Sequence, residues 1–483
     1  MARVNDDATV ASVLSSLGKT CSTFLGRSSA GAPFFKGPEL CTYYDGASPA
    51  GIDCSDTTNP GHEALCYCKT SLIQIEEDEH VADDSSSEED GPPDGFQLVQ
   101  VSADSSQMDA AVFSKIVRFE ASCANPQACY DIYLFGGCVA PGALGAATDR
   151  VYWGVVTPDN DRPTVRWREQ DPSPVPLAGH SVVVADPTYA IVLGGQSSCS
   201  EDATYLDLTF LWRRADAGWV SLPAIPEPCG LSFHTANYFN DAGNVGMVVL
   251  GGRRGTSGSA CSDPTAPRVS NKAWWFDLNR YVWTRKKTQG WLGVWGHASA
   301  VMDLTAAGPA NRLFVHGGRT EDGSINRVLL YSPLDGISTP GTPLLLETLS
   351  RTGVERMFHT MLPFRTSSLK LAGGARASED VWKPDNVYNN TWTAYAAKQI
   401  QTGVVQYNGA FRYPVATGVW GQAGLSYINQ STRSSTSYVF MILGGCVGEF
   451  CGLTNALYLY RSASQAALVT PVLLSLLGAF ALT

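Results

Sequence analysis

The sequence contains little charge, few long helical patterns and none of the common catalytic motifs. Charged residues make up only 16% of its 483 residues, and no basic stripe of the kind that binds nucleic acid is present. It holds no nucleophile elbow, no phosphate-binding loop and no zinc-protease motif. These absences argue against nucleic acid as a partner, and they leave any enzymatic activity without a supporting motif.

Apolar residues and glycine are abundant instead. Hydrophobic residues reach 44%, and there are 47 glycines, a composition that allows a sizeable core and favours an all-β class with many turns. The net charge of -11 is concentrated in residues 76–95, which hold ten acidic residues and no Lys or Arg. Because such a segment cannot form a core, we expect residues 76–95 to be an acidic, disordered linker.

Six apolar segments end in a pair of glycines, at intervals that repeat along the chain. The pairs are Gly136-Gly137, Gly194-Gly195, Gly251-Gly252, Gly317-Gly318, Gly373-Gly374 and Gly444-Gly445. Upstream of most pairs lies a segment of small residues with one polar residue, namely His180, His234, His297, His359 or Gln422. Downstream follows an aromatic residue and often a Trp. This order predicts a repeated four-stranded unit whose second strand ends at the glycines.

The pattern resembles the kelch-repeat β-propeller family over residues 96–461. The resemblance implies an all-β fold, a six-bladed kelch-type β-propeller, beside a small Cys-rich N-terminal region of residues 1–75. We expect residues 96–102 to supply the strand that the last blade lacks; the alternative is that residues 467–474 complete it. The fourth repeat departs from the pattern because no clear Trp follows Tyr331, and the first repeat has no upstream His.

Thirteen cysteines are many for a cytosolic protein and indicate an oxidising compartment. Those in residues 1–75 are Cys21, Cys41, Cys54, Cys66 and Cys68, and they predict a small disulfide-stapled module. Their spacing lacks the paired knuckles of zinc sites, so neither a metal nor a cofactor is predicted. In the propeller region we predict the disulfides Cys123–Cys129, Cys446–Cys451 and Cys199–Cys229, with Cys138 and Cys261 unassigned.

The end of the chain is apolar. Residues 466–483 carry no charge, so we expect residues 462–483 to be a hydrophobic tail that is a GPI-attachment signal or a membrane anchor; the alternative is a last strand or helix packed on the propeller. Sequons at Asn389 and Asn429 are candidate glycosylation sites. We predict a membrane-associated glycoprotein at the cell surface or outside the cell. A cytoplasmic location stays open, because the N-terminus has no clear signal peptide.

The longest predicted loop between a second and a third strand spans residues 253–272. It carries Arg253, Arg254, Arg268 and Lys272 against one acidic residue, Asp263. Long loops on rigid scaffolds often bind ligands, and the planar arginine fork suits anions. We expect these four residues to bind an acidic protein or a sulfated or sialylated glycan; the alternative is a tolerated surface insertion.

Together, these observations predict a non-catalytic binding module that recognises a protein or glycan ligand. Two alternatives stay open: a galactose-oxidase-like or sugar-processing enzyme, and an intracellular kelch adaptor. Against the first, no Tyr is followed directly by His, as the copper ligands of the oxidases require. The four histidines, with Gln422 in the fifth equivalent place, could bind a metal or an anion around a central channel, but we favour a hydrogen bond from each His to the backbone of the neighbouring blade.

Overall fold

The computed structural model describes residues 24–27, 33–35 and most of residues 97–461. Within the last range, the segments not described are 120–129, 141–144, 158–162, 201–202, 256–260, 262–266, 304–310, 325–327, 352–354, 365–367, 377–385, 389, 396–406, 413–417, 433–434 and 449–450. The predicted linker, the tail, the alternative closing strand and the five N-terminal cysteines therefore lie outside the described residues.

The chain divides into two compact units, Met1–Glu89 and Asp90–Thr483. In the first unit, β1 (Phe24–Arg27) pairs with β2 (Pro33–Phe35) in an antiparallel hairpin. The described part of the second unit is all-β and contains no helix. No helix long and apolar enough to cross a membrane occurs among the described residues.

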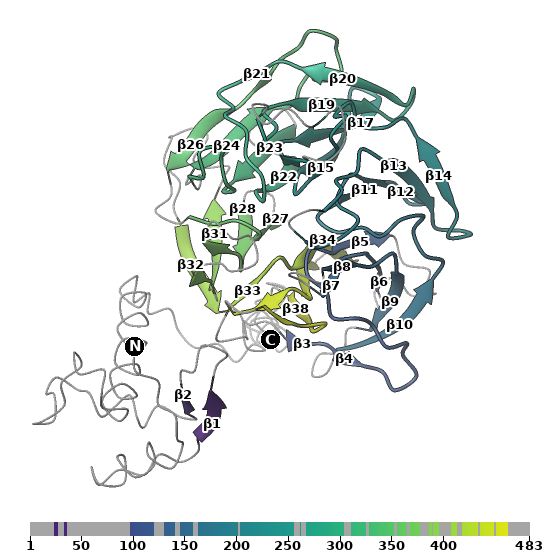
Figure 1. Cartoon of the computed structure of the whole chain (residues 1–483), viewed down its shortest axis with the longest axis vertical. Helices are drawn as coiled ribbons and strands as arrows, with labels where there is room; N and C mark the ends of the chain where they lie inside the picture. Colours follow the sequence, from purple (N-terminus) through teal and green to yellow (C-terminus); the bar gives the residue numbers. More distant parts are fainter. Residues whose placement is uncertain are drawn as a thin grey trace, which may run out of the picture. The chain divides into compact units, whose positions relative to one another are not determined.

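Six larger sheets, mainly antiparallel, make up most of the second unit (Figure 1). Sheet 1 contains β5 (Lys115–Phe119), β6 (Tyr130–Phe135), β9 (Val151–Thr157), β10 (Thr164–Gln170) and β4 (Gln100–Val101). Sheet 2 contains β11 (Ser181–Asp186), β12 (Tyr189–Leu193), β13 (Thr209–Arg213) and β14 (Trp219–Leu222). Sheet 3 contains β16 (Thr235–Asp241), β17 (Asn244–Leu250), β19 (Ala273–Asp277) and β20 (Val282–Lys286).

The remaining three larger sheets have the same strand order. Sheet 4 contains β22 (Ala298–Asp303), β23 (Asn311–His316), β24 (Val328–Pro333) and β26 (Glu347–Arg351). Sheet 5 contains β27 (Thr360–Phe364), β28 (Ser368–Ala372), β31 (Asn390–Tyr395) and β32 (Tyr407–Arg412). Sheet 6 contains β34 (Ala423–Thr432), β35 (Ser435–Leu443), β38 (Leu457–Arg461) and β3 (Gln97–Leu98).

Small sheets join connecting loops, and all but the pair of β21 (Thr288–Gln289) and β25 (Leu344–Leu345) include a loop that follows a double glycine. The others are β7 (Cys138–Ala140) with β8 (Ala146–Ala147), β15 (Leu231–Ser232) with β18 (Arg253–Arg254), β29 (Ala375–Arg376) with β30 (Asn386–Val387), and β33 (Val419–Trp420) with β36 (Cys446–Val447) and β37 (Gly452–Leu453).

The second strand of each larger sheet ends at a double glycine, as predicted. Both glycines have positive φ in all six pairs, a backbone conformation that favours glycine. The two positions also make different contacts with the next sheet. The second N–H donates to a carbonyl of the chain that leads into the next sheet, for example from Gly195 to Leu231 at 2.7 Å. A Cβ on the first glycine would lie 2.2–2.8 Å from that acceptor oxygen in all six pairs. The glycines therefore let neighbouring sheets hydrogen-bond at close range.

The predicted closing strand is present. Gln97–Leu98 (β3) pairs antiparallel with β38 and forms the fourth strand of sheet 6. The next residues, Gln100–Val101 (β4), pair parallel with β10 of sheet 1. One short segment thus adds an outer strand to both the first and the last sheet.

The innermost strands follow one another in a cycle. β5, β11, β16, β22, β27 and β34 each contact the next, and β34 contacts β5. Apolar clusters fill the spaces between sheets: one joins sheets 6 and 1 around Trp167 and Met441, and others join sheets 1 and 2, 2 and 3, 3 and 4, and 4 and 5. Most of the core therefore lies between sheets, which is why the second strands are apolar on both faces.

Three disulfides join described cysteines, and they correct part of the prediction. Cys446 pairs with Cys451, as expected. The predicted Cys199–Cys229 pair is wrong: Cys199 pairs with Cys138, and Cys229 pairs with Cys261. Cys123 and Cys129 lie outside the described residues.

Cys199 and Cys229 do not pair with each other because each lies against the loop of a different neighbouring sheet. The N–H of Cys199 donates to Gly145 in the loop of sheet 1, so Cys199 faces the preceding sheet. The carbonyl of Cys229 accepts from Gly255 in the loop of sheet 3, so Cys229 faces the following sheet. Disulfides of this number are typical of extracellular or secreted proteins.

Candidate functional site

A ring of backbone hydrogen bonds lies where the six innermost strands begin. Each of six equivalent residues donates its N–H to the carbonyl of the residue before it in the cycle, at 2.7–3.1 Å. In chain order they are Phe113, Gly179, Phe233, Gly296, Phe358 and Gly421, and all have positive φ. Phenylalanine and glycine alternate strictly around this ring.

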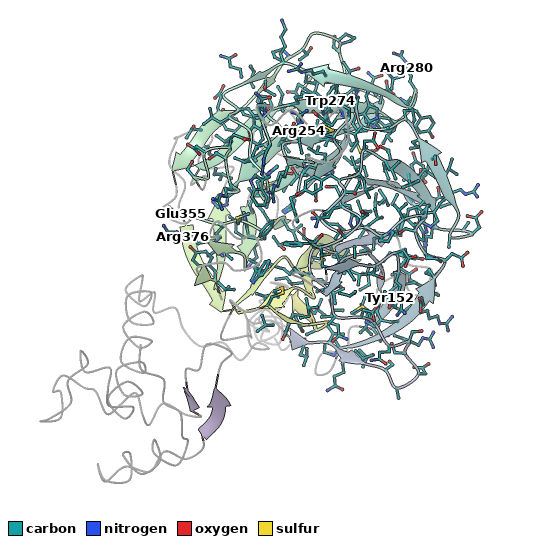
Figure 2. The ribbon with its side chains drawn as sticks, viewed as in Figure 1. Tyr152, Arg254, Trp274, Arg280, Glu355 and Arg376 are labelled. Carbon is teal, nitrogen blue, oxygen red and sulfur yellow. A yellow bond between two sulfur atoms is a disulfide. The ribbon has the colours of Figure 1, made fainter. Side chains whose placement is uncertain are left out.

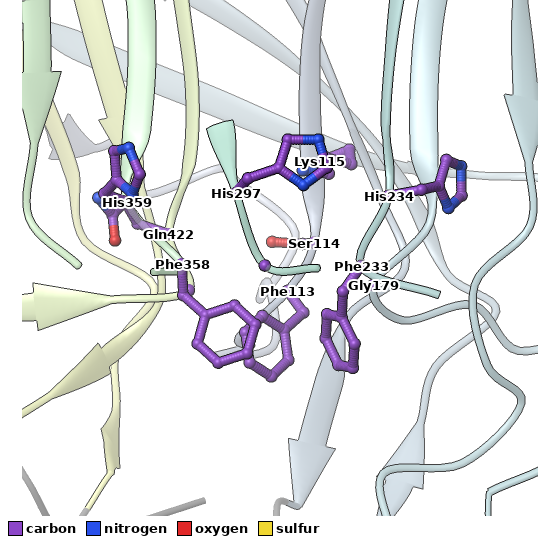
Figure 3. Close-up of a pocket in the computed structure, with 12 residues that line it drawn as sticks. Phe113, Ser114, Lys115, Gly179, Phe233, His234, His297, Phe358, His359 and Gln422 are labelled. Carbon is purple, nitrogen blue, oxygen red and sulfur yellow. The ribbon is translucent and has the colours of Figure 1, made fainter. Parts of the chain in front are cut away.

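The three phenyl groups meet and fill the centre on one side of the ring (Figure 3). Their ring centroids lie 4.8 Å apart for Phe113 and Phe233, 4.6 Å for Phe113 and Phe358, and 5.3 Å for Phe233 and Phe358. A Cβ on Gly421 would lie 2.8 Å from the Phe113 ring. Glycine alternates with phenylalanine because each phenyl group occupies the space that a neighbouring side chain would need.

The histidines one residue further along fit between two double glycines. A Cβ added to Gly252, which belongs to the same sheet, would lie only 2.7 Å from the Cβ of His234. Its Cε1 lies 2.6 Å from the position of a Cβ on Gly194 of the preceding sheet. The same packing recurs at His297 and His359. A histidine here therefore spans the joint between two sheets.

Several of these side chains also bond the preceding sheet. His297 Nε2 lies 2.8 Å from Thr235 Oγ1, His359 Nε2 lies 3.0 Å from His316 Nδ1, and Gln422 Nε2 donates to the carbonyl of Ala372 at 2.7 Å. The sequence predicts a backbone partner, but in these bonds the partner is a side chain for His297 and His359 and a backbone carbonyl only for Gln422. No group of three or more His, Cys, Asp or Glu side chains within the described ranges is placed to hold a metal ion.

The imidazoles are held neutral. Burial, together with a smaller contribution from the nearby Lys115 amine, lowers the pKa of His180, His234 and His297 to about 3. Burial also holds the pKa of His359 well below its usual value. At physiological pH these rings contribute hydrogen-bond donors and acceptors but no charge.

A pocket lies on the other side of the phenyl groups, at the centre of the six strands (Figure 3). Its volume is about 410 Å³, counted to include the part open to solvent. Ser114, Lys115, His234, His297, His359 and Gln422 line it with the backbone ring. None of its lining residues is acidic. Burial lowers the pKa of the half-buried Lys115 amine to about 8.

The basic loop predicted to bind a ligand surrounds a buried carboxylate. Glu227 is 0% exposed, and Lys272 Nζ lies 3.0 Å from both of its oxygens. Arg254 Nε lies 3.4 Å from Glu227, and the indole N–H of Trp274 donates to it at 3.1 Å (Figure 2). Two of the four predicted binding residues, Arg254 and Lys272, thus neutralise Glu227.

The other two basic residues lie further out. Arg253 is half-buried, with its guanidinium 5.4 Å from the centroid of Trp295. It also bonds Tyr205, where it opposes the burial that raises the pKa of that phenol. The Arg268 side chain is exposed, while its backbone N–H donates to Glu321 of the next loop at 3.0 Å. The structure brings all four residues to one loop, but only Arg253 and Arg268 are not paired with Glu227.

The candidate glycosylation sites cannot be placed in the same way. Asn389 lies outside the described residues, and Asn429 lies on β34, a strand whose side chains are not described at that point. Sequence reasoning missed Lys115, Ser114 and the alternating ring residues. The signal for the ring was present, because Gly or Phe directly precedes each histidine and Gln422.

The fold defines an all-β protein of mainly antiparallel sheets. No protein-family model matches the chain, and no curated protein matches its sequence. Among solved structures, the chain is similar to one titled "Structure of YjhT", with 13% sequence identity over 73% of this chain and 98% of that chain, and a TM-score of 0.48. A similarity at this TM-score carries no argument about function, so the site is interpreted from its own geometry.

Proposed function

We propose that residues 97–461 form a six-bladed kelch-type β-propeller that serves as a non-catalytic binding module for a protein or glycan ligand. The cycle of innermost strands, the ring of six backbone hydrogen bonds and the pairing of β3 with β38 support the propeller. The three disulfides support a location outside the cell or at its surface.

The observation that carries the binding function is the way the basic loop is held. Its beginning pairs as β18 with β15, its middle is tied by the Cys229–Cys261 disulfide, and its end is fixed by Lys272 and Glu227. A loop fixed at three places presents the side chains of Arg253 and Arg268 without a large entropy loss on binding. It is therefore suited to recognition.

Within this loop the four basic residues have two roles. Arg254 and Lys272 position the loop through Glu227, and Arg253 and Arg268 contact the ligand. A guanidinium pair favours carboxylate or sulfate groups, because each fork can bond two oxygens. The ligand class that fits is an acidic protein or a sulfated or sialylated glycan.

The test is a binding panel of sulfated, sialylated and neutral glycans together with acidic proteins. Replacing Arg253→Ala and Arg268→Ala together should weaken binding by about tenfold or more, the loss expected for charge-assisted hydrogen bonds. Arg280→Ala is the matched control, because Arg280 is an exposed arginine in the turn between β19 and β20, away from Arg254 in Figure 2. Equal binding by the double variant and the control, both folded, would remove this loop from the site.

A further inference from the structure

The Lys115 amine lies in the central pocket without a counter-charge. Within the described ranges no acidic residue lines the pocket, and the Lys115 amine makes neither an ion pair nor a hydrogen bond. Other partly buried lysines do have acceptors: Lys272 has Glu227, and Lys286 donates to the carbonyl of Thr339 at 2.9 Å. A half-buried cation without an acceptor is costly, so its place in a pocket calls for an explanation.

The surroundings of the amine suit an anion better than a cation. The hydroxyl of Ser114 lines the same pocket and can donate. The neighbouring imidazoles are neutral, so they add no charge beside the amine. The amide of Gln422 is already bonded to Ala372. A metal cation would meet the lysine charge and no carboxylate.

The shape of the pocket limits the size of its ligand. The phenyl groups of Phe113, Phe233 and Phe358 close one side, and the backbone ring leaves no passage between them (Figure 3). A polymer therefore cannot thread through the centre. We propose that this pocket binds a small tetrahedral oxyanion, such as inorganic phosphate or sulfate, through the Lys115 ammonium and the Ser114 hydroxyl.

The site should be sensitive to alkaline pH. His234, His297 and His359 line the pocket with the amine, and the charge of Lys115 also lowers the pKa of His180 outside the lining; these four rings stay neutral. Sheet 6 contributes the uncharged Gln422, and β5 itself carries Arg118. Lysine therefore supplies the titrating charge, and binding should weaken as the amine loses its proton above about pH 8.

Calorimetric titration of the full chain with sodium sulfate tests the proposal, at constant ionic strength set with chloride. Sulfate is the probe because its own charge does not change between pH 7 and pH 10. Binding by the wild type should be weakened about tenfold or more in Lys115→Met. Lys287→Met is the control, since Lys287 is exposed outside the pocket; it should bind as the wild type does.

A second variant separates a binding role from a packing role. Lys115→Arg keeps the charge but does not titrate, so its sulfate affinity should persist above pH 9, where that of the wild type falls. The proposal is overturned if sulfate and phosphate both fail to bind the wild type. It is also overturned if Lys115→Met binds as tightly as Lys287→Met, or if wild type and Lys115→Arg have the same pH profile.

Discussion

Two partly buried lysines of this molecule differ in whether a carboxylate balances their charge. Lys272, in the basic loop, has both oxygens of the buried Glu227 within 3.0 Å. Lys115, in the central pocket, has no carboxylate among its neighbours. The loop holds four basic residues in its sequence, but two of them, Arg254 and Lys272, are paired with the buried Glu227. The comparison teaches that a single cation without a counter-charge can call for an anion as much as a loop with four basic residues, two of which are already paired with Glu227.

The largest loss of stability should come from removing the charge of Glu227, the carboxylate that balances the basic loop. Glu227→Gln leaves Arg254 and Lys272 without their buried counter-charge, so the free energy of unfolding should fall by about 3–5 kcal/mol. Denaturant unfolding measures this. Glu169→Gln is the control, because Glu169 is half exposed and pairs with Arg150 at 3.5 Å; its change should be below about 1 kcal/mol. Equal losses in the two variants would contradict the role given to Glu227.

A smaller loss should follow when the lysine is removed and the carboxylate stays. Lys272→Met takes two hydrogen bonds from Glu227 but leaves Arg254 and the indole N–H of Trp274 in place. We expect the free energy of unfolding to fall by about 1–3 kcal/mol. The same denaturant measurement on Lys287→Met should show almost no change. A Lys272→Met protein as stable as this control would mean that Arg254 alone balances the carboxylate.

The smallest effect should have the opposite sign. Burial lowers the folded-state pKa of Lys115 to about 8 from its usual 10.5. Between these values the unfolded chain binds a proton that the folded chain does not, so wild-type stability should rise as pH rises from about 8 to 10.5. Below that window the charged amine destabilises the folded chain. Lys115→Met should therefore be more stable at pH 7 by about 1 kcal/mol, less than the full pKa shift would give, because the Lys115 side chain is partly exposed to solvent in the pocket.

Unfolding curves of both proteins from pH 7 to pH 10.5, in buffer without phosphate or sulfate, check this expectation. The stability difference between Lys115→Met and the wild type should shrink across the window and vanish near its upper end. A difference that does not change with pH would show that Lys115 is not the titrating group.

Much of the fold could be predicted from residues that serve the same purpose in every repeat. The double glycines mark the second strands because no other residue leaves room for the neighbouring carbonyl. The segment before the first repeat was expected to be a strand because the last repeat lacked one, and Gln97–Leu98 takes that place. Such features depend on the backbone, so they are visible in the sequence as repeats.

The disulfides and the pocket depend instead on side chains that differ between repeats. The sequence predicts a Cys199–Cys229 disulfide, but the true partners depend on which neighbouring sheet each loop contacts. Lys115 went unnoticed because the first repeat has Ser114 where the others have His or Gln. Glu227 went unnoticed because its partners come from a loop many residues later. Non-repeating contacts of this kind need the coordinates.

The alternation of phenylalanine and glycine also lowers the symmetry of the backbone ring. If every sheet contributed the same residue, all six positions of the ring would be equivalent. Instead sheets 1, 3 and 5 share one residue and sheets 2, 4 and 6 share the other. The segments "GVWGHAS" and "GVWGQAG", which begin at Gly293 and Gly418, are alike as well, and they lead into sheets 4 and 6. The repeating unit of the ring is therefore a pair of sheets, so a substitution at one Phe position has two equivalent positions and not five.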